Sequence, residues 1–196
     1  MKIQYFLLIA LVCLLSCKHV DKGTSKGTAG TDSTGVFDYS KTELSDEFRD
    51  STFHCFSKAD SKDKFTFYVP KGNIKTTKAI LMVRDAENNL VFSDTIATEE
   101  LINGYDLDEI KTGEQMQKAI LTRAKSILDA NSFIDDISSE PFFKNLSDEE
   151  FMDHNVFNEC QTDKRPLFIL SLEEENITYY GYSKILHKVV AIAGCC

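Results

Sequence analysis

The hydrophobic pattern of this 196-residue chain changes period twice, and this change limits the folds that the chain can adopt. Patterns typical of β-strands occupy residues 65–92 and 167–193, whereas residues 112–130 carry apolar side chains at helical spacing. Strands followed by helices and then by strands are typical of an α+β fold with a mostly antiparallel sheet. We therefore expect a single α+β domain over residues 36–196.

Both ends of this domain are predicted to form strands that are joined by tight turns. Residues 85–89 and 173–176 are rich in Asp, Asn and Glu and separate apolar runs, which indicates two hairpins. A Pro-Lys-Gly turn after Val69 ends the first strand. The expected strands are residues 65–69, 79–83, 90–92, 167–172, 177–182 and 189–193.

One long helix and one or two short helices are predicted between the strands. Thr112 and Gln115 have the spacing of a capping box, and the apolar residues after them fall on one helical face as far as about Ala130. Residues 147–150 form a second capping-box pattern with acidic side chains in the first turn, so a shorter helix is expected to begin there.

The N-terminal segment has the composition of a secretory leader. Lys2 provides a short basic start, and residues 5–15 form an apolar run that is too short to cross a bilayer of about 30 Å as a helix. Leu14-Leu15-Ser16-Cys17 resembles the lipobox of bacterial lipoproteins. The resemblance implies that residues 1–16 are a signal peptide and that Cys17 receives diacylglycerol and further acyl chains such as palmitate.

The residues after Cys17 predict a tether and a cellular location. Residues 17–35 are mostly Lys, Gly, Thr, Ser, Ala and Asp, which cannot bury enough apolar area to fold. In the sorting rule of Gram-negative lipoproteins, Lys18 in place of Asp favours the outer membrane. The expected location is therefore the outer membrane, with the domain facing either the periplasm or the cell exterior.

The charge of the chain excludes one class of partner. The formal net charge is -9 at pH 7, which argues against binding to nucleic acid and against direct adsorption to anionic lipids. The chain contains no phosphate-binding glycine loop, no GxSxG elbow and no HExxH helix, so the sequence indicates no cofactor and no common hydrolase site.

The four cysteines after the tether can be interpreted in two ways. Cys55, Cys160, Cys195 and Cys196 are an even number in an oxidising compartment, and we predict a disulfide from Cys195 or Cys196 to Cys55 or Cys160. The alternative is a metal site formed by thiolate and imidazole groups. Its candidate ligands are His54, Cys55, His154 and Cys160.

Other residues that could act in a binding or catalytic site can also be explained by an ordinary structural role. The aromatic segments 141–143 and 179–182 could stack on a ligand, but the alternation of the second segment favours packing in the core. The acids Asp135 and Asp136 could pair as in a glycosidase, although exposed acids are the default. Arg123, at the edge of the helical apolar face, either extends to solvent or binds an anion.

The functional hypothesis rests on the anchor and on the lack of catalytic motifs. The sequence favours a lipid-anchored envelope protein without enzymatic activity, whose domain binds another protein or a glycan. Two alternatives remain open at this point: a small envelope enzyme whose site is assembled from distant residues, and a purely structural lipoprotein. A cleft with converging histidines and carboxylates would favour the enzyme, whereas an exposed patch with aromatic side chains would favour binding.

Overall fold

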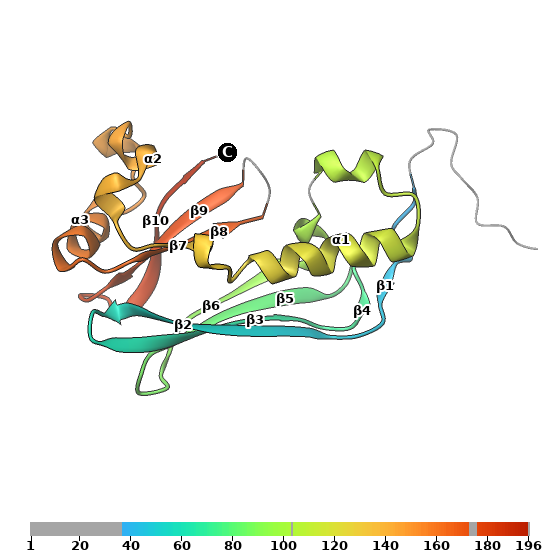
Figure 1. Ribbon diagram of the computed structural model, residues 1–196, viewed down its shortest axis with the longest axis horizontal. Coiled ribbons are helices and arrows are strands. Elements are labelled where there is room, and N and C mark those ends of the chain that lie inside the picture. Colours follow the sequence, from blue (N-terminus) through green and yellow to red (C-terminus); the bar gives the residue numbers. More distant parts are fainter. Residues whose placement is uncertain (1–36, 103, 173–175, 196) are drawn as a thin grey trace, which may run out of the picture. The chain divides into compact units, whose positions relative to one another are not determined.

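The computed structural model describes residues 37–102, 104–172 and 176–195 (Figure 1). All of these residues belong to one compact unit. The unit combines antiparallel sheets with helices, so the predicted α+β class is confirmed.

The first sheet is formed by four strands from the first half of the domain. Its strand order is β2-β3-β5-β6, and every neighbouring pair is antiparallel. A separate two-stranded sheet is formed by β1 (Glu43–Leu44), which precedes β2 in the chain, and β4 (Gly72–Asn73), which lies between β3 and β5. The strands of the first sheet are β2 (Phe48–Lys58), β3 (Ser61–Val69), β5 (Lys78–Arg84) and β6 (Leu90–Ala97).

The second sheet contains the C-terminal strands together with one short earlier strand. Its order is β10-β9-β8-β7, again antiparallel throughout. The register between β10 and β9 shifts between Ala191 and Ala193. The strands are β7 (Phe133–Ile134), β8 (Leu167–Ser171), β9 (Ile177–Ser183) and β10 (Lys188–Cys195).

Three α-helices and several 3-10 turns connect the strands in the described part of the chain. The α-helices are α1 (Gly113–Ser126), α2 (Pro141–Lys144) and α3 (His154–Asp163). The 3-10 turns are η1 (Thr98–Leu101), η2 (Gly104–Asp108), η3 (Ala130–Ser132), η4 (Ile137–Ser139) and η5 (Asp148–Glu150).

Helix α1 begins at the predicted cap and ends earlier than predicted. The Thr112 hydroxyl accepts a hydrogen bond from the Gln115 backbone N–H at 3.2 Å, as a capping residue should. The helix stops at Ser126 rather than near Ala130, and the Ser126 carbonyl accepts from the Ser132 hydroxyl at 3.2 Å. A side chain therefore occupies the acceptor that the next helical turn would have used.

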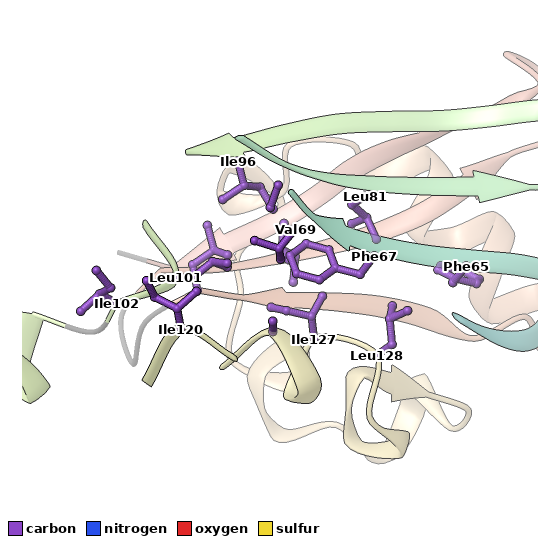
Figure 2. Close-up of a cluster of buried hydrophobic side chains, with 14 of the residues drawn as sticks. Phe65, Phe67, Val69, Leu81, Ile96, Leu101, Ile102, Ile120, Ile127 and Leu128 are labelled. Carbon is purple, nitrogen blue, oxygen red and sulfur yellow. The ribbon is translucent and has the colours of Figure 1, made fainter. Parts of the chain in front are cut away.

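The main core lies between the first sheet, α1 and the second sheet. Figure 2 shows Phe67, Val69 and Leu81 pointing from the first sheet toward the segment that carries Ile120 and Ile127. Alternation places these side chains on one face of the sheet, here called the inner face. Full burial of a side chain of this size contributes about 1.5–3 kcal/mol, so this core supplies much of the stability. The second sheet adds its buried residues Phe168, Leu170 and Val189, and the buried Leu172 follows β8 directly.

A second core forms where α2 and α3 pack on the other face of the second sheet. Cys160 of α3 is fully buried there, and its sulfur lies where a side chain on Gly181 would begin: a Cβ at Gly181 would be 3.0 Å from the Cys160 Sγ. Glycine at position 181 therefore allows the close approach of α3 to β9. The other buried members are Ile137, Phe143, Val156, Phe157, Leu167, Tyr179, Ile192 and Ala193.

Two elements differ from the sequence prediction. The sequence does not predict β2, because its inner positions Asp50, Thr52 and His54 are polar and conceal the alternation. The capping box at residues 147–150 exists, with the Glu150 carboxylate accepting from the Ser147 backbone N–H at 2.7 Å. However, it starts only the single turn η5, and α3 begins at His154, where the Asp153 side chain caps it.

Candidate binding surface

The first sheet has an outer face that is left uncovered by the described helices and strands that build the two cores. On β3, Lys64, Thr66 and Tyr68 alternate with the buried residues of the inner face and are not buried. Neither core contains an outer-face residue. The register assigns to this outer face Arg49, Ser51, Phe53, Lys64, Thr66, Tyr68, Lys78, Ile80, Met82, Arg84, Leu90, Ser93, Thr95 and Ala97.

Strand pairing arranges these side chains in rows that cross the sheet. The middle row is uncharged and consists of Ser51, Thr66, Met82 and Ser93. Rows of this kind hold side chains from neighbouring strands within about 4.5–5.5 Å of each other at the Cβ atoms. The face is consequently a regular array of closely spaced groups.

The row next to it places two cations directly opposite each other. Lys64 of β3 is in register with Arg84 of β5, and no acidic residue occupies this row. Like charges in direct register destabilise a sheet. The row ends in two exposed apolar side chains, because Phe53 on β2 is 54% exposed and Leu90 on β6 is 51% exposed. Two cations between two apolar groups are suited to an anionic group that carries apolar surface around it.

The third row fixes an aromatic ring in place. The Arg49 guanidinium lies over the Tyr68 ring, 4.5 Å from its centroid, which is a cation–π contact. The Tyr68 hydroxyl donates to the Glu47 carboxylate at 2.9 Å, and this hydrogen bond raises the pKa of Tyr68. Tyr68 is thereby held from both sides in one orientation.

The outer face has the opposite charge to the domain around it. Residues 37–196 contain 18 lysines and arginines against 29 aspartates and glutamates. None of the paired outer-face positions is acidic and four of them are basic, and the acid that reaches this face is Glu47, which accepts from Tyr68. None of these four cations, Arg49, Lys64, Lys78 and Arg84, forms an ion pair within the described part of the chain.

The dimensions of the outer face limit the kind of contact that it can make. Four strands at about 4.8 Å spacing and three rows at about 6.8 Å spacing cover about 14 by 14 Å between backbones, or a few hundred Å² with their side chains. A stable interface buries about 800 Å² on each partner. The face alone therefore suits a transient partner rather than an obligate one.

Three cavities of the domain are defined by the described residues that line them. A cavity of about 420 Å³ is lined by the Asp135–Ser138 segment, Gln161, Lys164 and Arg165. Two hollows of about 460 and 240 Å³ lie beside α1 and share Arg123. None of these three cavities is lined by histidine or cysteine. The cavity of about 420 Å³ contains Asp135 and Asp136, the two acids that the sequence offers as a glycosidase pair.

The structure does not bring the proposed metal ligands together. His54 stacks on Phe133 with ring centroids 3.4 Å apart, and burial lowers its pKa. His154 stacks on Phe151 at the start of α3. Cys160 is buried in the second core, where burial raises the pKa of its thiol. The described residues contain no group of three or more His, Cys, Asp or Glu that could hold a metal, so the structure gives no support to a metal site at His54, Cys55, His154 and Cys160.

The predicted disulfide falls partly outside the described residues. Cys55 and Cys160 are free thiols, so they are not joined to each other. The side chain of Cys195 and the whole of Cys196 are outside the part that the structure describes. A bridge from Cys195 or Cys196 stays a prediction.

Two other interpretations can be compared with the structure. The aromatic segments pack in the core as predicted: Phe142 stacks on Tyr179 at 4.6 Å between centroids, and Tyr180 packs against the main core. The lipobox with Cys17 lies outside the described residues, as do the leader and residues 17–35.

The outer face is hard to recognise in the sequence because the apolar run of β5 conceals it. Residues 79–83 form one continuous apolar run, but their side chains alternate between faces, so Ile80 and Met82 lie on the outer face. Two features of the sequence could have indicated this face. Strand β5 has apolar residues on both of its sides, and the basic residues Lys64 and Arg84 lie near it. Phe53 and Arg49 could not be placed without β2.

Comparisons with family models, with curated proteins and with solved structures found no match for this chain. No helix in the described ranges has the length and apolar content to cross a membrane. The fold and its surface thus define an α+β domain with two four-stranded antiparallel sheets, one of which has a basic face that the described residues leave uncovered.

Proposed function

We propose that this chain is a lipid-anchored envelope protein that binds an acidic protein partner through the outer face and has no enzymatic activity. The observation that carries the proposal is a sheet face that the described residues leave uncovered, with four cations that make no ion pair to any described residue. Two of these cations, Lys64 and Arg84, lie between the exposed Phe53 and Leu90. Oppositely charged surfaces attract and orient each other, so the partner surface is acidic.

The residue types on the outer face favour a protein over a glycan. Aromatic residues, methionine and arginine are enriched in protein–protein interfaces. The outer face combines Arg49, Phe53, Tyr68, Met82 and Arg84. Exposed aromatic and arginine side chains of this kind also supply most binding hot spots.

The anchor determines which proteins the domain can reach. Lipid on Cys17 would hold the chain on the membrane, because burial of acyl carbons gains about 0.8 kcal/mol per methylene. A flexible tether over residues 17–35 would keep the domain about 20–25 Å from the headgroups on average. The partner is accordingly an envelope protein, and the outer membrane is the proposed location.

The anchor gives the first prediction. Replacing Cys17 by alanine is expected to abolish fatty-acid labelling and to leave the protein soluble or unprocessed, because the thiol is the acceptor of the lipid. Labelling with a radioactive or clickable fatty acid measures this directly. Cys13→Ala, which changes a cysteine inside the leader, is the matched control and keeps its label. Equal labelling of the Cys17→Ala protein would refute the anchor.

The outer face gives the second prediction. The double variant Lys64→Glu with Arg84→Glu replaces the two central cations by acids, which repel an acidic partner. We expect the protein that co-purifies with the native lipoprotein from detergent-solubilised envelopes to fall by about tenfold or more, because truncation or reversal of interface charges costs a few kcal/mol. Quantitative mass spectrometry of the purified material measures the retained partner.

A control with the same charge change separates this effect from net charge. Lys111→Glu with Lys125→Glu alters two exposed lysines at the start and end of α1, and retention should stay at the native level. Retention should also decrease as salt is raised, because salt screens exposed charges. The proposal would be contradicted if both double variants lost the same amount of co-purifying partner. It would also be contradicted if the co-purifying material resisted protease and was removed by glycosidases.

A further inference from the structure

Two adjacent hollows, together called the groove here, lie along one flank of α1 and share lining residues. A hollow of about 460 Å³ begins at η1, and a hollow of about 240 Å³ continues from the end of α1 toward β8. Arg123 and Ser126 line both hollows and join them. Ligand sites typically have volumes of about 300–1,000 Å³, so the groove is large enough for a small molecule.

Arg123 is the central cation of this groove and has no acidic partner. Its side chain is half-buried, yet it makes no ion pair and no side-chain hydrogen bond to any described residue. A guanidinium offers five N–H donors and pairs with a carboxylate through two parallel hydrogen bonds. The Arg123 guanidinium therefore has N–H donors that no described residue occupies and that can pair with an anion in the groove.

The rest of the lining is rich in neutral polar groups. One acid, Asp129, is present, and its carboxylate does not cap the turn η3 that follows it. A free carboxylate accepts hydrogen bonds from hydroxyl groups but repels an approaching dianion. A second cation, Lys118, lines the larger hollow, and the neutral polar lining residues are Gln115, Thr122, Ser126, Asn131, Ser132 and Ser171.

We propose that this groove binds an acidic sugar, that is, a hydroxylated ring with one carboxylate. The carboxylate pairs with Arg123, the hydroxyl groups bond to Asp129 and the neutral polar side chains, and the apolar ring face lies on the partly exposed Ile169. The site is independent of the outer face, because α1 packs on the inner side of the first sheet.

Titration of the detergent-solubilised full-length protein with D-glucuronate tests this proposal by calorimetry. We expect saturable binding of glucuronate that is at least about tenfold tighter than binding of D-glucose, which lacks the carboxylate, and of acetate, which lacks the ring. Arg123→Gln should weaken glucuronate binding by about tenfold or more, since a hydrogen bond to a charged group is worth about 1.5–3 kcal/mol.

Lys125→Gln is the matched control, because it removes one positive charge from the same helix outside the groove. Its glucuronate affinity should equal that of the native protein, and both variants should keep the native melting temperature. The proposal is overturned if glucuronate and glucose bind equally, if Lys125→Gln weakens binding as much as Arg123→Gln, or if inorganic phosphate binds more tightly than glucuronate.

Discussion

Replacing Asp63 by alanine is expected to lower the free energy of unfolding by about 3–5 kcal/mol, because this buried carboxylate satisfies three donors. Asp63 is 0% exposed on the inner face of β3. It accepts hydrogen bonds from the Phe56 backbone N–H at 3.1 Å, from the Ser57 hydroxyl at 2.8 Å and from the Ser57 backbone N–H. These donors lie where β2 shifts its register between His54 and Lys58.

The bulge makes this carboxylate necessary. A bulge removes backbone groups from the strand ladder, and buried N–H groups without a partner each cost about 1–3 kcal/mol. Urea unfolding of Asp63→Ala measures the loss. Asp60→Ala in the exposed turn before β3 removes the same charge without these bonds and should change stability little. An Asp63→Ala protein within 1 kcal/mol of the native value would show that the carboxylate does not hold the bulge.

Replacing Arg165 by alanine is expected to cost about 3 kcal/mol, the second largest effect of a single substitution. The Arg165 side chain is 1% exposed, and its Nη1 donates to the Tyr182 carbonyl at 2.7 Å. Its Nε contacts the Asp163 carboxylate at 3.2 Å and its Nη2 lies 3.8 Å from the Glu159 carboxylate. These contacts tie the end of α3 to β9.

Two further variants separate the contributions of this arginine. Arg165→Met keeps most of the side-chain volume and loses the hydrogen bonds, so it should lose somewhat less stability than the alanine variant. Lys184→Met removes only the partly exposed lysine that contacts Asp163 at 2.6 Å, and surface ion pairs contribute little. Thermal unfolding of Arg165→Ala, Arg165→Met and Lys184→Met ranks their stabilities. A Lys184→Met protein as unstable as Arg165→Ala would place the stabilisation at the surface instead.

The elements that the sequence predicted correctly have regular hydrophobic patterns. Phe65, Phe67 and Val69 alternate cleanly because only one face of β3 is buried, and the Thr112 cap has its own short signature. Strand β2 was missed because the polar inner residues Asp50, Thr52 and His54 break the alternation. The order of strands in each sheet depends on contacts between distant segments, which local patterns do not record.

The same distinction applies to the functional surface. The sequence showed the basic residues Lys64 and Arg84 but could not show that they face each other, because this depends on the register between β3 and β5. Arg123 was identified as a candidate anion ligand from its place on the helix, and the structure adds the groove around it. Asp63 and Arg165 are buried charges, and nothing in their sequence neighbourhood distinguishes them from exposed ones.

The central claim, that the outer face binds an acidic protein, is tested most directly by photo-crosslinking in living cells. A photoreactive phenylalanine analogue at Thr66 lies in the middle row of the outer face, and the same analogue at Glu114 lies on exposed α1. We predict that the Thr66 position forms an adduct with an acidic protein, that the Glu114 position does not, and that Lys64→Glu with Arg84→Glu removes the adduct. An adduct at Glu114 without one at Thr66, or a Thr66 adduct unaffected by charge reversal, would contradict this account.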